Sequence, residues 1–359
     1  MADTKQKVAF IGTGIMGAPI AGHILDAGYD VTVYNRTKSK TDDLVARGAH
    51  WAETPAAAAA DADIVFTMVG FPTDVEEIYL SGEGLLASAK SGAYLIDLTT
   101  SAPELARDIA EAAETMDKHA FDCPVTGGEA GAIAGTLTLI VGATEHDIAP
   151  VRAVLETFSS KIFCFGGPGK GQAAKLANQV SLAASMVGMA DALSFAQQSN
   201  LDLALVREMI LGGTGKSGAM EQLAPKSLDG DWKPGFMVKH FLKDLGLALQ
   251  VAEEREIALP GTDTAFTLYD MLEAIGGGDL GTQAITLLYQ EEAEAVAAGL
   301  DWSLYTSAHE DEDECGCGHH HDHDHECACG HDHEHGDHEC CGGHDHGEHE
   351  CGCGHHHKE

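Results

Sequence analysis

Short apolar runs rich in β-branched and aromatic residues recur through the first half of the chain. They are KVAFIG (7–12), DVTVYN (30–35), DIVFTMV (63–69), AYLIDLTT (93–100), AFDCPV (120–125), TLTLIVGA (136–143) and KIFCFG (161–166). Helical patterns such as APIAGHILDAG (18–28) and APELARDIAEAAETM (102–116) separate the earlier runs. This alternation predicts an α/β domain with a doubly wound sheet. Less helix separates the last runs, which predicts a mixed far edge of that sheet.

The pattern changes after residue 168. From about 169 to 305, Ala, Leu and Met recur at three-to-four-residue spacing, which predicts an all-helical domain entered through the hinge GGPGKG (166–171). From His309 onward there is no Leu, Ile, Val, Met or aromatic residue, so this part cannot bury a core and we expect it to be disordered. The predicted organisation is a sheet domain over 1–168, a helical domain over 169–305 and a tail over 306–359.

Charge and cysteine usage narrow the class of protein. The net charge is -36, with 57 acidic against 21 basic residues, which disfavours binding to nucleic acid or to an anionic membrane. Eight of the ten cysteines follow residue 314, so the body holds only Cys123 and Cys164, and we expect a reduced, cytoplasmic protein. MADTKQKVAFIG lacks signal-peptide features, and no apolar run is expected to span a membrane.

A glycine-rich turn follows the first predicted strand. VAFIGTGIMGAPIAGHIL carries Gly12, Gly14 and Gly17 as G-x-G-x-x-G between a strand and a helix. Gly12 permits the tight turn, Gly14 lets backbone amides approach a pyrophosphate, and Gly17 allows close helix–sheet packing. The motif predicts a dinucleotide site, and the alternative is a plain glycine-rich turn.

The residues after the second strand bear on the choice of cofactor. Asn35, Arg36 and Thr37 stand where NAD sites usually carry an acid for the ribose 2′-hydroxyl. A guanidinium and a hydroxyl would instead hold a 2′-phosphate, so we predict a preference for NADP, with NAD also possible. Arg36 could alternatively be a solvated turn residue.

Together with later segments, these residues resemble the β-hydroxyacid dehydrogenase family, of the 3-hydroxyisobutyrate dehydrogenase and tartronate semialdehyde reductase type. The similar segments are the cofactor fingerprint FIGTGIMGAPIAGHIL, the nicotinamide loop DLTTSAPELA (97–106), the substrate segment FDCPVTGGEAGAIAGTLTLIVGA (121–143), the catalytic helix GKGQAAKLANQV (169–180) and the late Lys-Asp motif FLKDLGLAL (241–249). The resemblance spans roughly residues 7 to 300. It implies an N-terminal Rossmann domain that binds NADP, an all-α C-terminal domain for substrate binding and dimerisation, and a homodimer or homotetramer.

The same resemblance implies roles for individual residues. Lys175 would be the catalytic general acid/base, Thr126, Gly127 and Gly128 would cradle a substrate carboxylate, and Asn178 and Gln179 would contact substrate or orient the lysine. The implied cofactor-binding residues are Gly12, Gly14, Ile15, Met16, Gly17, Asn35, Arg36, Thr37, Met68, Val69, Thr100 and Lys243.

Two positions depart from the common family pattern. Thr126 stands where the family usually has Ser, which adds a methyl group to the pocket. The pair Asn178-Gln179 replaces Asn-Asn, as in sequences similar to tartronate semialdehyde reductase. Both departures bear on which substrate is used.

The chemistry suits a lysine in a partly apolar helix. Hydride transfer to a carbonyl leaves an alkoxide that must take up a proton, and a positioned ammonium can donate it. A free lysine titrates near 10.4. Burial among AAKLA and an oxidised nicotinamide would lower the pKa of Lys175, whereas a substrate carboxylate would raise it, so the sign of the net shift stays open.

Each site has a structural alternative. Lys175 could be a surface lysine, and Thr126-Gly127-Gly128 could be a simple turn rather than a nest of N–H groups for a carboxylate. Lys243 and Asp244 could be solvated helix charges.

The tail has metal-ligand composition. Thiolates and imidazoles bind Zn²⁺ and Ni²⁺, and their irregular spacing predicts several labile sites that take no part in catalysis. The candidate ligands are Cys315, Cys317, His319, His320, His321, Cys327, Cys329, Cys351, Cys353, His355, His356 and His357. An engineered tag and a solvated acidic tail are the alternatives.

The predicted function is an NAD(P)-dependent oxidoreductase that interconverts a small 3-hydroxy acid, or a related hydroxy acid, and its semialdehyde or keto form. One alternative is a metal-storage protein or metallochaperone on a Rossmann scaffold. Another is an imine reductase-like enzyme, although that branch of the family generally lacks the lysine.

Overall fold

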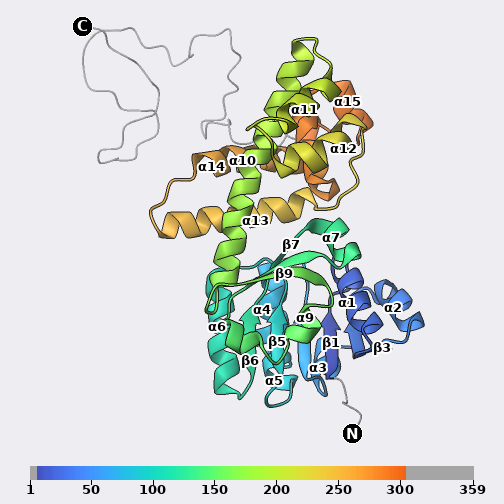
Figure 1. Ribbon diagram of the computed structural model, residues 1–359, viewed down its shortest axis with the longest axis vertical. Coiled ribbons are helices and arrows are strands. Elements are labelled where there is room, and N and C mark those ends of the chain that lie inside the picture. Colours follow the sequence, from blue (N-terminus) through green and yellow to red (C-terminus); the bar gives the residue numbers. More distant parts are fainter. Residues whose placement is uncertain (1–5, 305–359) are drawn as a thin grey trace, which may run out of the picture. The chain divides into compact units, whose positions relative to one another are not determined.

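The structure is a computed structural model that describes residues 6–304 of the 359-residue chain (Figure 1). The predicted metal ligands of the tail lie outside the described residues. Strands and helices alternate up to residue 164, and helices alone follow from residue 170.

The main sheet has six parallel strands in the order β3-β2-β1-β4-β5-β6. Their bounds are β1 Lys7–Ile11, β2 Asp30–Tyr34, β3 His50–Trp51, β4 Ile64–Thr67, β5 Tyr94–Asp97 and β6 His119–Asp122. Strand order reverses between β1 and β4, so the predicted doubly wound sheet is confirmed. The two-residue strand β3 was not predicted, because it is too short to show alternation.

Alternate residues of each strand enter two separate cores. Val8 and Phe10 of β1 belong to one core, whereas Ala9 and Ile11 belong to the other. Helices α3, α4, α5 and α6 cover the second face, and α1 with the segment after residue 125 covers the first. Both faces are therefore buried, as near-continuous apolar strands indicate.

The last predicted strands form a sheet of their own. Strands β7 (Val125–Thr126), β8 (Leu137–Val141) and β9 (Ser159–Cys164) have the order β7-β8-β9, with β7–β8 antiparallel and β8–β9 parallel. Mixed pairing was predicted correctly, but its place at the far edge of the main sheet was wrong. The inward-facing residues of β8 instead pack over one face of the main sheet and share its core.

The helices of the first part surround the sheets. Their bounds are α1 Gly17–Asp26, η1 Lys38–Thr41, α2 Asp42–Ala46, α3 Pro55–Ala59, α4 Pro72–Leu80, α5 Leu85–Ser88, α6 Pro103–Thr115, α7 Gly128–Ala134, α8 Glu145–Ile148 and α9 Arg152–Leu155.

The second part is all helical, as predicted, and has its own core. Its elements are α10 Lys170–Gln198, α11 Leu203–Leu211, the π-helix η2 Ala219–Leu223, α12 Ala224–Leu228, α13 Val238–Glu254, α14 Pro260–Ala274, the 3₁₀ helices η3 Gly277–Asp279 and η4 Thr282–Tyr289, and α15 Glu292–Ala297. Phe241 and Tyr269 are fully buried at the centre of this core.

Helix α10 links the two parts. It contacts α6, β6 and β8 near its start and α13, α14 and η4 further along (Figure 1). By length and composition α10 is apolar enough to cross a membrane, so the expectation that no segment would meet this test was wrong. The buried core helix of a globular protein passes the same test, and α10 supplies many residues of the helical core.

Candidate active site

The glycine-rich turn lies at the point where strand order reverses. Gly12 follows β1 with φ +97°, and a Cβ there would lie 2.2 Å from the Met68 carbonyl oxygen after β4. A Cβ at Gly17 would lie 1.9 Å from the Gly12 carbonyl oxygen. Both glycines are therefore needed for packing, and they bring the carboxyl ends of β1 and β4 together, where ligands bind in such sheets.

The centre of this turn is open and suits a dinucleotide phosphate. A Cβ at Gly14 would meet no atom within 4 Å. Thr13 is 2% exposed, and its hydroxyl has no hydrogen-bond partner among the described residues. Helix α1 begins here without a side-chain cap at Met16, so its first amides are left for an anion. Ile15, at 41% exposure, lies at the outer side of the turn.

Residues 35–37, which were predicted to select the cofactor, have two different kinds of contact. The Thr13 amide donates to Asn35 Oδ1 at 3.0 Å, and Asn35 Nδ2 donates to the Thr37 carbonyl at 3.0 Å, so Asn35 holds the turn. The Arg36 side chain is 90% exposed and lies 3.8 Å from Asp74 Oδ1. A guanidinium this exposed can reorient toward a phosphate at small cost.

Loop 98–102, after β5, is bound by both parts of the molecule. Val69 donates its amide to Thr99 Oγ1 at 3.0 Å. The Thr100 carbonyl accepts a hydrogen bond from Lys243 Nζ of α13. Met68, Val69, Thr100 and Lys243 are therefore brought together as predicted for residues around one cofactor, with Met68 and Val69 following β4.

The start of α10 is anchored on a buried carboxylate. Asp122, at the end of β6, accepts from the Gly169 amide at 2.8 Å and the Gln172 amide at 2.6 Å. Burial raises the pKa of Asp122, and these backbone hydrogen bonds oppose the rise. A Cβ at Gly171 would lie 2.5 Å from the Ile140 carbonyl of β8, so the first turn of α10 lies directly against the small sheet.

Lys175 is buried in the second turn of α10. The residue is 7% exposed, and within residues 6–304 no hydrogen bond or ion pair reaches its amine. Burial lowers the pKa of Lys175 from 10.5 to about 8, an effect that the charge of Asp244 opposes and that of Lys243 reinforces. The net shift of the Lys175 pKa, whose sign the sequence left open, is therefore downward. A lysine with this pKa can donate and accept protons near neutral pH.

A chain of polar contacts surrounds this lysine. Asn178 Nδ2 donates to Gln179 Oε1 at 2.9 Å, and Gln179 Nε2 donates to Asp244 Oδ2 at 2.7 Å. Asp244 Oδ1 lies 2.9 Å from Lys243 Nζ. Gln179 and Asp244 are each 1% exposed, which makes this a buried ion pair rather than the solvated alternative.

The predicted carboxylate cradle lies between β7 and α7. Thr126 ends β7, Gly127 has φ +128° and Gly128 has φ +61°. A Cβ at Gly128 would meet no atom within 4 Å, so this backbone is open to a ligand. No hydrogen bond in the described part of the chain joins the cradle to Lys175. The two are connected through β8, which pairs with β7 and packs against α10.

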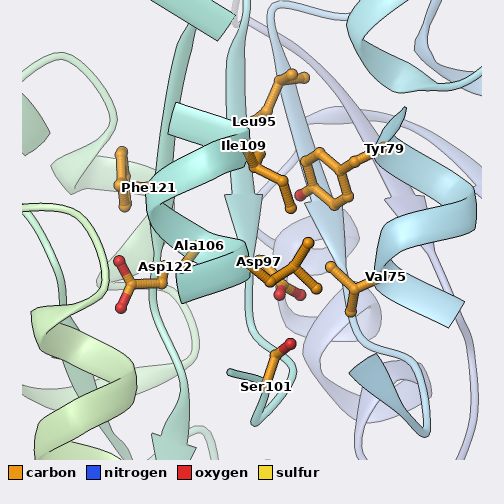
Figure 2. Close-up of a pocket in the computed structure, with 10 residues that line it drawn as sticks. Val75, Tyr79, Leu95, Asp97, Ser101, Ala106, Ile109, Phe121 and Asp122 are labelled. Atoms are coloured by element: carbon orange, nitrogen blue, oxygen red, sulfur yellow. The ribbon is translucent and has the colours of Figure 1, made fainter. Parts of the chain in front are cut away.

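A small internal cavity lies behind loop 98–102. It measures about 10 Å³, close to the minimum for one water, and its polar lining is Asp97, Ser101 and Asp122 (Figure 2). Asp97 Oδ1 accepts from Thr67 Oγ1 at 2.8 Å and from the Thr99 amide at 3.0 Å. Burial raises the pKa of Asp97 to about 6, despite these hydrogen bonds.

Sequence reasoning missed Asp97, Asp122 and Gln172. The two acids each end an otherwise apolar strand, which is the signal that could have found them. Gln172 had a weaker signal, a lone amide at the start of an apolar helix. The predicted contacts Asn178 and Gln179 were found, but the Gln179 amide is engaged by protein groups on both sides.

The geometry can be compared with known proteins. Residues 7–166 match the family model described as the NAD-binding domain of 6-phosphogluconate dehydrogenase, and residues 169–289 match the one described as NAD-binding of NADP-dependent 3-hydroxyisobutyrate dehydrogenase. A probable 3-hydroxyisobutyrate dehydrogenase-like protein of Arabidopsis thaliana is 41% identical over 79% of this chain and 85% of its own. The chain belongs to the β-hydroxyacid dehydrogenase family.

Two further proteins are similar to this chain in sequence or structure. The oxidoreductase YkwC of Bacillus subtilis is 43% identical over 79% of this chain and 99% of its own. The solved 3-hydroxyisobutyrate dehydrogenase of Mycobacterium tuberculosis, obtained with L-serine, is 30% identical with a TM-score of 0.73, over 80% of this chain and 100% of its own. The protein is therefore an NAD(P)-dependent hydroxyacid dehydrogenase that acts on a CH–OH group.

Proposed function

We propose that this protein interconverts a small 3-hydroxy acid and its semialdehyde with NADP as the preferred cofactor and Lys175 as general acid/base. The observation that carries the proposal is the buried Lys175 amine, which has no hydrogen-bond or ion-pair partner within residues 6–304 and a pKa of about 8. A purely structural lysine would reach solvent or pair with a carboxylate. An enzyme that must accept and return a proton instead needs an amine whose two forms are both accessible.

NADP(H), when bound, supplies or accepts the hydride. Lys175 accepts the hydroxyl proton during oxidation and returns it to the carbonyl oxygen during reduction. The charge of Asp244 favours the cationic form of Lys175, but the ion pair of Asp244 is with Lys243, so Asp244 does not hold the proton on Lys175. The Asn178 side chain, one turn further along α10, is only partly buried and can meet the substrate.

The substrate class follows from the open backbone at Thr126, Gly127 and Gly128. Consecutive positive φ angles aim N–H groups into one concavity, which suits a carboxylate without requiring an arginine. The Mycobacterium tuberculosis relative was solved with L-serine, which is itself a 3-hydroxy acid. We infer that the substrate is a 3-hydroxy acid, in which one carbon atom separates the carboxylate from the reacting alcohol carbon.

The NADP preference is carried by Arg36. Its guanidinium is exposed beside the second strand and contacts only Asp74 within the described residues, at 3.8 Å. A 2′-phosphate would offer it a closer and more highly charged partner. Comparable kcat/KM for NADPH and NADH would contradict this preference.

The test is a panel of short semialdehydes and 3-hydroxy acids assayed with NADPH and NADH. Lys175→Ala should lower kcat by about 100-fold or more while NADP still binds. The matched control is Lys170→Ala, because Lys170 is exposed on the same helix and should leave turnover unchanged. Wild-type turnover of Lys175→Ala would refute the proposed role. A protein inactive with this panel and also with cyclic imines would favour the metal-storage alternative.

We propose a second property for the tail from its composition alone. Sixteen histidines and eight cysteines from residue 309 onward would bind Zn²⁺ or Ni²⁺. Elemental analysis should find more metal in the full-length protein than in a chain ending at Thr306, with equal NADPH turnover in both. Equal metal content would contradict metal binding by the tail. The expected homodimer or homotetramer stays a prediction, which analytical ultracentrifugation can test. The cytoplasmic location also stays a prediction.

A further inference from the structure

Gln172 is a fully buried amide that the proposed chemistry does not use. It lies in the first turn of α10, three residues before Lys175, and is 0% exposed. Its Nε2 donates to the Thr99 carbonyl at 2.7 Å, and its Oε1 accepts from the Ser101 amide at 2.9 Å. One side chain therefore binds both neighbours of Thr100, in the manner of a strand partner.

The contact requires a group with one donor and one acceptor. The Thr99 carbonyl can only accept and the Ser101 amide can only donate, so neither a carboxylate nor an ammonium can satisfy both. The backbone of Gln172 is also fixed, because its amide donates to Asp122 Oδ2 at 2.6 Å. Gln172 is thus held to β6 through its main chain and to loop 98–102 through its side chain.

The same loop is held from the other side by α13. Thr100 lies between the two residues bound by Gln172, and its carbonyl accepts from Lys243. Residues three apart on a helix share a face, so Gln172 and Lys175 lie on one side of α10. The position of the Lys175 amine relative to the Thr100 backbone therefore depends on the Gln172 contact.

We infer that Gln172 is a positioning residue, which sets the distance between the Lys175 amine and the loop beside the cofactor by binding Thr99 and Ser101 together. The inference rests on the proposed function, in which Lys175 transfers the proton. A displacement of about 1 Å between reacting groups can cost about 100-fold in rate, so loss of the contact lowers kcat and leaves substrate KM within about two-fold.

Gln172→Glu is the informative variant. An ionised carboxylate would repel the Thr99 carbonyl, whereas a protonated carboxyl group can donate to Thr99 and accept from Ser101 as the amide does. The titratable groups placed around this contact are Asp122 on β6, Asp97 on β5, Arg107 on α6, Lys175 on α10 and Lys243 on α13. Burial and the two carboxylates raise the pKa of the new acid, and the basic groups lower it. Burial is the largest effect on the neighbouring acids Asp97 and Asp122, whose pKa values are raised, so we expect the pKa of the new acid to be raised toward neutral pH as well.

The expected result is a kcat ratio of variant to wild type that recovers as pH falls. At pH 9 we expect roughly a 100-fold loss, and by pH 6 a recovery of at least about ten-fold. Using the ratio removes the part of the Lys175 titration that is common to both proteins. Gln197→Glu is the matched control, because Gln197 is exposed near the end of the same helix and its ratio should stay near one at every pH.

A second measurement tests the contact without relying on activity. In Gln172→Met, which removes the amide without introducing a carboxylate, the amide of Ser101 should exchange hydrogen faster than in the wild type, and kcat should be low at every pH. Unchanged exchange at Ser101 would overturn the contact itself. Faster exchange with wild-type kcat, or a pH-independent ratio for Gln172→Glu, would overturn the positioning role. Full turnover of Lys175→Ala would instead refute the proposed function, whatever the exchange result.

Discussion

At the scale of single residues, the site depends on a cation that lacks a dedicated counterion. Asp244 is the acid that acts on Lys175, but its Oδ2 accepts a hydrogen bond from Gln179 and its Oδ1 forms an ion pair with Lys243 instead of Lys175. The penalty of burial on the Lys175 ammonium is therefore only partly offset. A buried amine with its own carboxylate would stay protonated, and this one is free to exchange its proton.

The first prediction concerns the pH dependence of turnover. Because the pKa of Lys175 is about 8, kcat/KM for oxidation should rise with pH and level off above about 8, as the neutral amine becomes the dominant form. For reduction, kcat/KM should fall over the same range, because the ammonium is then the required form. Steady-state rates with NADP⁺ and NADPH between pH 6 and 10 would check both limbs. If kcat/KM changed with pH in the same sense for oxidation and reduction, Lys175 would not be the general acid/base.

The second prediction concerns stability. The folded pKa of Lys175, about 8, lies below the unfolded value of 10.5, so the unfolded chain holds more protons between these pH values and stability rises with pH there. Lys175→Met should therefore be more stable than the wild type by up to about 3 kcal/mol at pH 7, with the difference shrinking above pH 8. Denaturant unfolding at pH 7 and pH 10 measures it. A variant less stable at pH 7 would show that the lysine stabilises the fold.

At the scale of elements, local patterns predicted much and contacts between distant segments were missed. The apolar strands and the turn from Gly12 to Gly17 could be predicted because each is specified by a pattern of about ten consecutive residues. Asp122 and Gln172 meet across fifty residues of chain, and nothing local in either segment specifies the other. The small sheet was misplaced for the same reason, since the packing of β8 over the face of the main sheet depends on strands and helices that are distant in sequence.

The third prediction separates the two kinds of glycine in the turn. Gly17→Ala places a Cβ 1.9 Å from a carbonyl oxygen and should lower the melting temperature by several degrees. Gly14→Ala places its Cβ in open space, so the melting temperature should hold while NADP binding weakens by at least about ten-fold. Thermal unfolding with and without NADP distinguishes them. Tight NADP binding by Gly14→Ala would mean that no phosphate approaches this glycine.

At the scale of the whole molecule, the sequence predicted the change from alternating strands and helices to helices alone, but not that one helix packs against both. The change from alternating to helical patterns near residue 168 matches the start of α10 at Lys170. The sequence could not show that the first turn of α10 belongs with the sheets and the rest with the helical core, because the exposed side of the helix carries mainly small or apolar residues such as Ala177, Ala184 and Gly188 and so gives no clear polar face. The same absence makes α10 resemble a membrane span by composition.

Helix α10 also determines where a chimera between this enzyme and a relative can be joined. A chimera joined at the turn between Gly166 and Gly169 looks attractive, because it exchanges the helical half as a block. Such a junction would draw Gln172 from one parent and the Thr99, Ser101 and Asp122 groups that bind it from the other. Parents that differ at the amide or at the acid would give hybrids that fold but turn over slowly. Moving the junction further along α10, past Leu176, would keep the Gln172 contacts from a single parent.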